Sequence, residues 1–226
     1  MIVTIHQPDF LPWLGFFDRW MQSDLYIVLD DVQFIRRGWH HRDKIKTAQG
    51  VQWLTIPVVK KGRYGELIKD VRLDISNDGM QRVLNRVRAA YVKAPCFDPI
   101  YTEVEKIFSS GCKYLIDLNM ILLKTCADIL KINTPIVFSS DFNVTTKGTQ
   151  RLLDLTKRVK GSIYLTGLGS KSYLETKIFE KENISILWQN YHHPDYNQLH
   201  GKFTEKLSVL DFIMMVPNPS EYFIFK

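Results

Sequence analysis

Two short polar segments of this sequence carry side chains that could do chemistry, and each directly follows an apolar run. His6 and Gln7 end the first run, and Asp30 and Asp31 end the second. An imidazole titrates near neutrality and can take a proton from an attacking amine or hydroxyl, while a carboxylate can orient the imidazole or take the proton in its place. The residues therefore predict general base catalysis by His6, with Asp30 or Asp31 in support.

A third segment, YLTGLGSKSY, can supply groups that stabilise a negative charge. Its glycines, Gly167 and Gly169, lie where an apolar run opens into a helical pattern. Backbone amides at such a point, together with the hydroxyls of Thr166 and Ser170, are typical of an oxyanion or phosphate cradle. The same pattern also occurs in ordinary strand-to-helix turns, so it indicates a site mainly by its position.

The positive charge of the chain is concentrated in residues 36–72. That window holds ten basic and three acidic residues, a net charge of +7, against +6 for the whole chain. Such a segment is either a solvated face or an anion-binding surface whose loops approach phosphate closely. The cations of this predicted surface are Arg36, Arg37, Arg42, Lys44, Lys60, Lys61 and Arg63.

Each of these interpretations has a plainer alternative. His6 can be a core histidine bonded to a backbone carbonyl, and the Asp30–Asp31 pair can cap a turn or a helix. No metal site is expected, because the six histidines form neither an HxxxH nor an HxH pair and the three cysteines have no CxxC spacing. A serine hydrolase is not indicated either, since the sequence has no GxSxG motif.

Length and composition are those of an ordinary globular protein. The 226 residues, 45% of them hydrophobic, are enough for one large domain or two small ones. An odd number of cysteines without paired spacing favours a reducing compartment. Neither a secretion signal nor an apolar run of about 18 residues is recognised, so we expect a cytoplasmic protein without membrane insertion.

The hydrophobic pattern predicts an α/β fold with a mostly parallel sheet. After residue 133 strands and helices alternate, which implies parallel pairing with right-handed crossovers. The window from about residue 79 to 132 predicts a helical insertion in a single domain spanning residues 1–226. The expected strands are 1–5, 25–29, 52–58, 71–75, 136–139, 163–166 and 184–188, and the expected helices after the first are about 79–94, 99–108, 113–130, 149–159, 171–179 and 207–215.

Several segments together resemble the WbqC-like protein family. They are IHQPDFLPWLGFF, LDDVQFIRRGW, RDKIKT, WLTIPV, YVKAPCF, YLIDLN, YLTGLGSKSYL and HPDYNQLHGKF, and they cover nearly the whole chain. The pattern HQPxxLPWxG is specific to that family. Its members accompany bacterial genes for O-antigen, lipopolysaccharide and other surface polysaccharides, so the resemblance implies a transferase that moves glycine or another aminoacyl group to a sugar.

The family motifs extend the set of candidate substrate-binding residues. Together with the residues argued above, that set is Gln7, Trp13, Gln33, Arg37, Trp39, His41, Arg42, Lys44, Thr166, Gly167, Gly169, Ser170 and Tyr173. Two positions depart from the family pattern, because the resemblance implies an amide at Asp43 and often another at His41. The hydrogen bonds of this loop, and with them the substrate, can therefore differ from those of other members.

A more distant similarity concerns the first strand and the loop after it. The segment Trp13–Phe16 stands where nucleotidylyltransferases of the HxGH type carry their signature, which implies a Rossmann-like sheet of the HUP or nucleotidyltransferase kind. Both histidines of that signature are replaced here. Adenylyl transfer by that route would lose its main electrostatic groups.

The leading hypothesis from the sequence is an aminoacyl transferase acting on a nucleotide- or lipid-linked sugar. The donor would be an aminoacyl-tRNA, a carrier thioester or an ATP-derived adenylate, with RNA entering only as that donor and DNA playing no part. The alternatives are an ATP-dependent ligase or nucleotidyltransferase and a non-catalytic sugar-nucleotide-binding protein. We expect His6, Gln7, Asp31, Arg42 and Thr166 to line one concave site, since parallel strands end at one edge of a sheet.

Overall fold

A computed structural model of the chain describes residues 1–59, 62–76 and 78–222, and these fall into two compact units. Unit 1 comprises residues 1–7, 16–31 and 132–192, and unit 2 comprises residues 8–15, 32–131 and 193 onward. The chain passes between the units several times, so each unit is built from segments that are distant in sequence. Two cations of the predicted basic surface, Lys60 and Lys61, lie outside the described residues.

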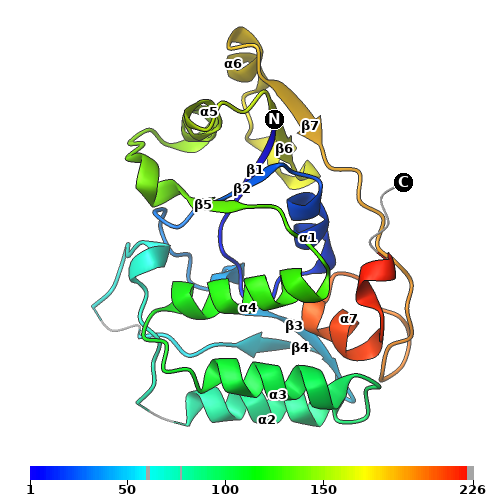
Figure 1. Cartoon of the computed structure of the whole chain (residues 1–226). Coiled ribbons are helices and arrows are strands. Elements are labelled where there is room, and N and C mark those ends of the chain that lie inside the picture. Colours follow the sequence, from blue (N-terminus) through cyan, green and yellow to red (C-terminus); the bar gives the residue numbers. More distant parts are fainter. Residues whose placement is uncertain (60–61, 77, 223–226) are drawn as a thin grey trace. The chain divides into compact units, whose positions relative to one another are not determined.

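Unit 1 is built on a five-stranded parallel sheet (Figure 1). Its strands are β1 (Ile2–His6), β2 (Leu25–Val28), β5 (Ile136–Phe138), β6 (Ile163–Thr166) and β7 (Ser185–Trp188), in the spatial order β5-β2-β1-β6-β7. Renumbered along the chain, this is the order 3-2-1-4-5 of a Rossmann fold. The α/β prediction is confirmed, and so are the five strands expected in these places.

Helices pack on both faces of this sheet. Side chains alternate between the two faces along each strand, so neighbouring residues of β1 meet different helices. Val3 and Ile5 of β1 share a hydrophobic core with Phe179 of α6. His6 lies on the opposite face, where its ring meets that of Phe16 from α1 at 5.2 Å. The helices of unit 1 are α1 (Leu14–Met21, from Phe16 onward), α5 (Gly148–Arg158) and α6 (Thr176–Lys181), with short 3-10 turns η3 (Ser139–Phe142) and η4 (Leu168–Ser172).

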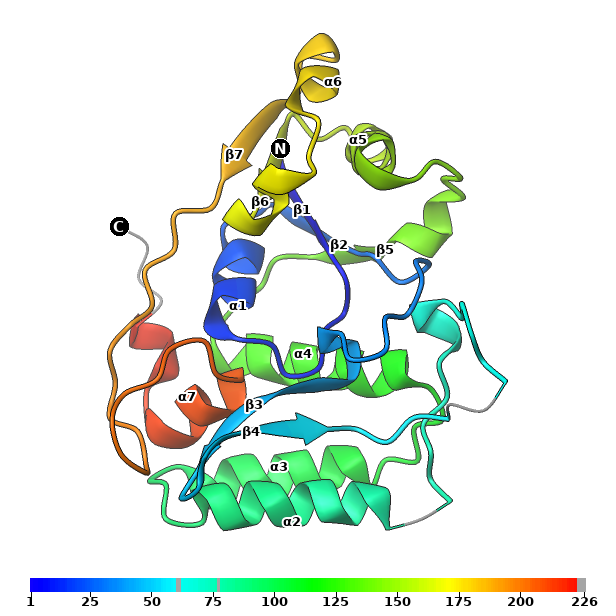
Figure 2. The ribbon, with the colours of Figure 1, turned by 180° about the vertical axis from the view of Figure 1, so that it is seen from behind.

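Unit 2 combines an antiparallel hairpin with a layer of helices, seen most clearly in Figure 2. Its elements are β3 (Arg42–Thr47), β4 (Gly50–Thr55), α2 (Gly79–Tyr91), α3 (Phe97–Phe108), α4 (Leu115–Ile129), α7 (Val209–Met215) and the 3-10 turns η1 (Trp39–His41), η2 (Ile68–Asp70) and η5 (Pro219–Tyr222). The helices expected between residues 79 and 130 and near the carboxyl terminus are therefore present. The prediction of a single domain with an insertion stays a prediction.

The secondary structure of residues 42–47 differs from the sequence analysis. Arg42 and Lys44 were expected in loops, but they lie on β3, which pairs with β4 in a register that places Lys44 opposite Trp53. Residues on alternate positions of a strand share a face, so Arg42 and Lys44 point to the same side of the hairpin. The basic surface is in part a strand face.

The strand expected at residues 71–75 does not form. The Leu73 amide donates to the carbonyl of Lys113 at 2.9 Å, whereas the Asp74 amide donates to the carbonyl of Pro57 at 3.0 Å. Because successive amides bond to different segments, isolated bridges replace a ladder. The backbone is satisfied without a continuous strand.

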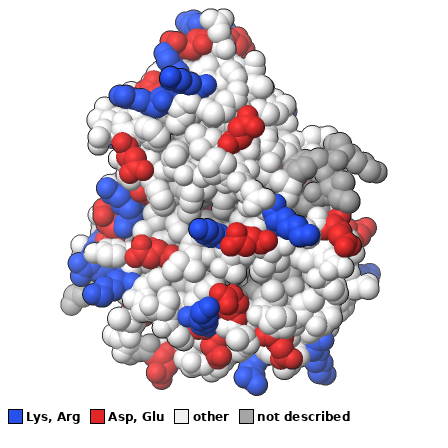
Figure 3. All heavy atoms as spheres, viewed as in Figure 1, with Lys and Arg blue, Asp and Glu red and all other residues white. Residues whose placement is uncertain are grey.

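The helix lengths and the surface charges are those of the described residues. No helix among the described residues is long and apolar enough to cross a membrane. On the face drawn in Figure 3, basic and acidic side chains are interspersed and form no large patch of one sign.

Candidate functional site

The strand order of unit 1 reverses between β1 and β6. The neighbour that follows β1 in the chain, β2, lies on one side of it, and β6 lies on the other. Open α/β sheets bind ligands in the crevice outside the carboxyl ends of the strands at such a switch point. His6 ends β1, Gln7 follows it, and Thr166 and Gly167 occupy the corresponding positions at β6. The sheet thus brings four predicted site residues to one edge.

The ring of His6 is held in a defined orientation. It is half-buried, its Nδ1 lies 3.0 Å from the carbonyl oxygen of Gln7, and the hydroxyl of Tyr26 donates to the carbonyl oxygen of His6 at 3.1 Å. A carbonyl can only accept, so Nδ1 carries the hydrogen and Nε2 of the neutral ring carries the lone pair. That tautomer suits a general base. A core histidine would make the same bond, so the geometry is compatible with both interpretations.

The glycine loop after β6 is closed by its own side chains. Ser170 Oγ donates to the carbonyl of Gly167 at 2.8 Å, and Thr166 Oγ1 lies 2.9 Å from Ser170 Oγ. Leu168 and Gly169 begin the 3-10 turn η4, so their amides have no carbonyl partner within that turn, and a Cβ at Gly169 would meet nothing within 4 Å. The groups available to an anion here are therefore these two amides, while the hydroxyls hold the turn.

A cation from α1 lies against this loop. A Cβ at Gly167 would lie 2.7 Å from Arg19 Nη1, so a larger residue there would displace the end of the Arg19 side chain. Beside it, Asp18 accepts from Gln189 Nε2 at 2.5 Å and from Gln22 Nε2 at 2.8 Å. Burial raises the pKa of Asp18, although these hydrogen bonds act in the opposite direction. The sequence analysis did not single out Arg19, since nothing in a helix sequence shows which loop its side chains reach.

Asp30 and Asp31 both bind the turn that follows β5. Asp30 is 4% exposed, and it accepts from the amide of Ser140 at 3.0 Å and from its hydroxyl at 2.8 Å. Ser139 Oγ lies 3.0 Å from Asp30 Oδ1 and 2.5 Å from Asp31 Oδ1, and its one hydrogen is shared between these two acceptors. Asp31 also accepts from Arg151 Nη2 at 2.6 Å. Burial acts to raise the pKa of Asp31, but the bonds from Ser139 and Arg151 outweigh it and hold that pKa below its usual value. These contacts favour a capping role, and a catalytic role for either carboxyl stays a prediction.

Cations and aromatic rings share one face of the hairpin in unit 2. The guanidinium carbon of Arg42 lies 4.1 Å from the ring centre of Trp53, and Lys44 Nζ lies 5.3 Å from it. The rings of Trp39 and Trp53 are 5.1 Å apart. Arg42 also donates to the carbonyl of Arg37. Arg42 therefore has two structural roles. It fixes the preceding loop by bonding to the Arg37 carbonyl, and its guanidinium packs over the Trp53 ring.

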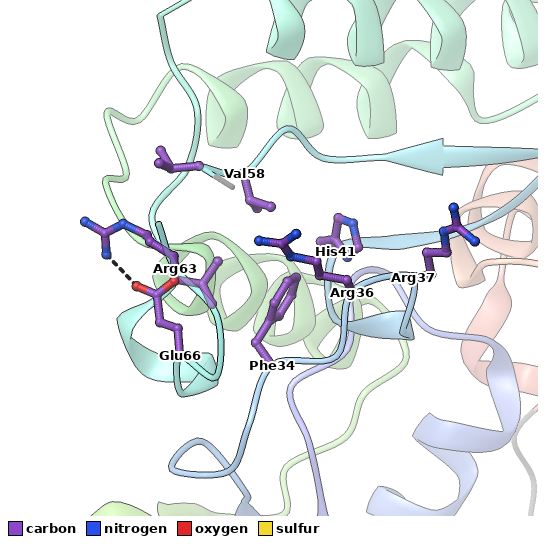
Figure 4. A pocket seen from close by; sticks show the side chains of 9 residues that line it. Phe34, Arg36, Arg37, His41, Val58, Arg63 and Glu66 are labelled. Atoms are coloured by element: carbon purple, nitrogen blue, oxygen red, sulfur yellow. Dashed lines mark hydrogen bonds and ion pairs between the residues drawn. The ribbon is translucent and has the colours of Figure 1, made fainter. Parts of the chain in front are cut away.

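A pocket of about 240 Å³ lies beside that loop in unit 2 (Figure 4). It is lined by Phe34, Arg36, Arg37, His41, Val58, Val59, Arg63, Glu66 and Val71. Figure 4 shows Arg36 extending between Phe34 and Val58, whereas Arg37 leads away from them. Arg63 pairs with Glu66 at 2.5 Å. The pocket thus has apolar walls and a positive balance of charge.

The remaining predicted residues differ in their surroundings. Gln33 is exposed and bridges to Leu67, and Tyr173 is 64% exposed. Trp13 is half-buried, and a Cβ at Gly15 would lie 2.3 Å from its ring. Close packing therefore explains the Trp13–Gly15 pair of the first motif. Arg42 belongs to unit 2, so its convergence with the four residues of unit 1 stays a prediction.

Comparison with known proteins agrees with the resemblance. The profile of the WbqC-like protein family matches residues 7–221. The chain belongs to the WbqC-like protein family. It is 32% identical over 222 residues to "Uncharacterized protein Rv1507c" of Mycobacterium tuberculosis (strain ATCC 25618 / H37Rv), an alignment that covers 95% of this chain and 93% of that protein. No solved structure matches the chain.

One motif of this WbqC-like chain has a structural explanation in unit 2. In the segment HPDYNQLHGKF, Gln198 Oε1 accepts from the buried Lys46 Nζ at 2.9 Å, and the hydroxyl of Tyr196 donates to Asp211 Oδ1 at 2.9 Å. Tyr91 donates to the other oxygen of Asp211 at 2.9 Å. Burial raises the pKa of Asp211, and these bonds satisfy its carboxyl group.

Unit 2 holds a buried polar cluster of Asp9, His40, His41 and Asp43. His41 and Asp43 were singled out in the sequence, whereas Asp9 and His40 were missed. Each is at most 6% exposed, and His40 Nε2 lies 4.0 Å from Asp9 Oδ1. Burial lowers the pKa of His40 to about 4. Burial also raises the pKa of Asp43 to about 8, and Asp9 adds to that rise. Among the described residues, no three His, Cys, Asp or Glu side chains are grouped as a metal site would require.

The unusual residue at position 43 offered a signal for this cluster. The family resemblance implies an amide where Asp43 stands. A carboxyl group with a pKa near 8 is protonated at pH 7, so it has one hydrogen-bond donor and an acceptor, as an amide side chain does. The departure from the family pattern therefore preserves the hydrogen-bonding character of the position.

Proposed function

We propose that this protein transfers an aminoacyl group of the glycine type to an amino or hydroxyl group of a nucleotide- or lipid-linked sugar, in the synthesis of O-antigen or another surface polysaccharide. The observation that supports this most is the switch point of unit 1, where His6 and the Gly167 loop end neighbouring strands. Membership of the WbqC-like family adds the association with polysaccharide synthesis that the resemblance implies.

The proposed chemistry assigns one task to each group at this edge. As the amine or hydroxyl of the sugar forms its bond to the acyl carbon, His6 Nε2 takes the proton that is released. The amides of Leu168 and Gly169 hold the oxyanion of the tetrahedral intermediate. When the bond between the acyl carbon and the donor breaks, His6 returns the proton to the leaving group. Atoms and charge balance without another reactant.

His6 is a better base than either aspartate in this scheme. Asp31 is paired with Arg151, and its lowered pKa makes it a weaker proton acceptor at neutral pH. Asp30 uses both carboxylate oxygens to hold the turn at Ser139 and Ser140. In unit 2, Arg42 holds the preceding loop through the carbonyl of Arg37, and phosphate binding by Arg37 and Lys44 stays a prediction from the sequence.

The test is an acyl-transfer assay with radiolabelled glycine offered as glycyl-tRNA, as a glycyl thioester and as glycine with ATP. Nucleotide-linked amino sugars serve as acceptors. Replacing His6 with Ala should lower turnover by about 10²- to 10⁴-fold, the usual contribution of a general base, while the thermal melt and acceptor binding stay close to those of the wild type. His192→Ala is the matched control, because His192 is an exposed histidine of the same unit.

Three outcomes would replace the proposal. Full turnover by a folded His6→Ala protein removes the base from this edge. Pyrophosphate release that depends on ATP but not on the acceptor indicates the ligase or nucleotidyltransferase alternative. Tight binding of a sugar nucleotide without transfer from any donor indicates a binding protein.

A further inference from the structure

The pocket of unit 2 has a backbone frame that holds its walls in place. The Phe34 amide donates to the carbonyl of Glu66 at 2.8 Å, and the Val59 amide donates to the carbonyl of Arg72 at 2.9 Å. The turn beside Arg36 is closed by the Gly38 amide, which donates to the carbonyl of Ile35 at 2.9 Å. These backbone bonds tie the segments that form the walls of the pocket to one another.

The charges around the pocket do not cancel. Glu66 is the acidic group of the lining, and its carboxylate is already paired with Arg63 at 2.5 Å. Arg36 is a further cation, and Figure 4 shows its guanidinium between the side chains of Phe34 and Val58. A guanidinium in this position, between apolar groups, favours a planar anion that can accept two parallel hydrogen bonds.

The walls beside this guanidinium are apolar and aromatic. Phe34 packs against His41 with ring centres 5.2 Å apart, and Val58 and Val71 are at most 5% exposed. The volume of about 240 Å³ lies below the roughly 300–1,000 Å³ of pockets that hold drug-sized ligands. It therefore suits a small organic acid.

We propose that this pocket binds a short-chain carboxylate, with the carboxylate on Arg36 and the hydrocarbon tail against Phe34, Val58 and Val71. This site is separate from the transfer chemistry of unit 1 and stands without it. A phosphate dianion fits less well, because Phe34, Val58 and Val71 form apolar walls and Glu66 places a carboxylate in the lining beside Arg63.

Ligand-observed NMR titration can test this site with three probes. Isovalerate carries both the charge and the branched tail, 3-methylbutanol keeps the tail without the charge, and acetate keeps the charge with almost no tail. We expect isovalerate to bind about tenfold or more tightly than either of the others, because only isovalerate both pairs its carboxylate with Arg36 and buries a branched tail against the apolar walls. Equal binding of isovalerate and 3-methylbutanol, or no binding of isovalerate, would overturn the proposal.

Substitutions place the binding in this pocket. Arg36→Gln should weaken isovalerate binding by roughly 10- to 100-fold, the effect of losing a hydrogen bond to a charged group. Arg82→Gln is the matched control, because it removes the same charge from an exposed position on α2, and it should leave binding unchanged. An equal loss in both variants would mean that only the general charge of the protein acts.

A second variant keeps the test independent of Arg36 and of folding. Val59 lines the pocket and is only partly buried, so Val59→Phe can fill the space while every charge is retained. We expect it to abolish isovalerate binding with a thermal melt close to that of the wild type. Undiminished binding by a folded Val59→Phe protein would show that isovalerate binds elsewhere.

Discussion

Two carboxyl groups, Asp31 in unit 1 and Asp43 in unit 2, lie in opposite environments. Asp31 accepts from Arg151 at 2.6 Å and has a lowered pKa. Asp43 is 2% exposed and accepts from the Lys44 amide at 2.6 Å, and burial raises its pKa to about 8. Asp31 keeps its charge because the hydroxyl of Ser139 and the guanidinium of Arg151 stabilise the carboxylate, whereas burial outweighs the nearby amide at Asp43 and favours the protonated form.

The difference teaches that the same residue type fulfils two functions in this chain. Asp31 is an anion that fixes a turn to a helix. Asp43 is a neutral group at pH 7 that accepts from the Lys44 amide and has a hydrogen to donate. Substitutions that alter charge without altering shape should therefore have opposite effects in the two units.

The largest effect is expected from removing the cation that compensates Asp31. Arg151→Ala leaves Asp31 without its partner in a site where Arg151 is only 9% exposed, and it also removes the donor to the carbonyl of Thr146. The free energy of unfolding should fall by about 2–4 kcal/mol, somewhat below the value for a fully buried pair because Asp31 keeps some contact with water. Urea denaturation at pH 7 measures it. A change below about 0.5 kcal/mol, the scale of a surface substitution, would mean that the pair is solvated.

The next effect should be a gain in stability from Asp43→Asn. A folded-state pKa near 8, above the ordinary 3.8, means that the folded chain keeps a proton that the unfolded chain releases. Stability contributed by this group is therefore fully present below about pH 4 and declines as pH rises toward 8. Asparagine should raise the free energy of unfolding at pH 8 by about 1–3 kcal/mol and flatten its decline between pH 6.5 and 8.

The same substitution at position 31 should have the opposite sign and a smaller size. Asp31→Asn preserves the shape and the contact with Ser139 but removes the charge that meets Arg151, so we expect a loss of about 1–1.5 kcal/mol at pH 7. Because the folded pKa of Asp31 is lowered, its contribution is present above pH 3.8 and lost as pH falls through the folded value. Acid denaturation curves of the two variants should therefore converge toward the wild type from opposite sides, and two shifts of the same sign would contradict the comparison.

The sheet of unit 1 could be predicted because its strands are continuous apolar runs. Strands of a parallel sheet are buried on both faces, so β1, β2 and β6 stand out from the polar segments around them. Strand β3 could not be recognised in the same way. Its buried positions include Asp43 and Lys46. Asp43 can be buried because its carboxyl group is protonated, and Lys46 can be buried because it bonds to Gln198, 152 residues away.

The candidate site was predictable to the same extent. Parallel strands end at one edge, so the proximity of His6 and Gly167 followed from the strand assignments. The pocket of unit 2 did not, because its walls come from four separate segments and from a turn in which Arg37 adopts a φ of 68°, a left-handed conformation unusual for arginine. The residue types in this segment do not predict such a turn.

The central strand of unit 1 also imposes an order on folding. The side chain of Thr4 bonds to the carbonyl of Leu165, 161 residues later, and residues 2–4 of β1 pair with residues 163–165 of β6. At synthesis rates of about 5–20 residues per second, β1 waits roughly 8–30 s on the ribosome before its second neighbour exists. During that time one edge of an apolar strand is open to other chains, so the sheet combines a high contact order with a vulnerable nascent state.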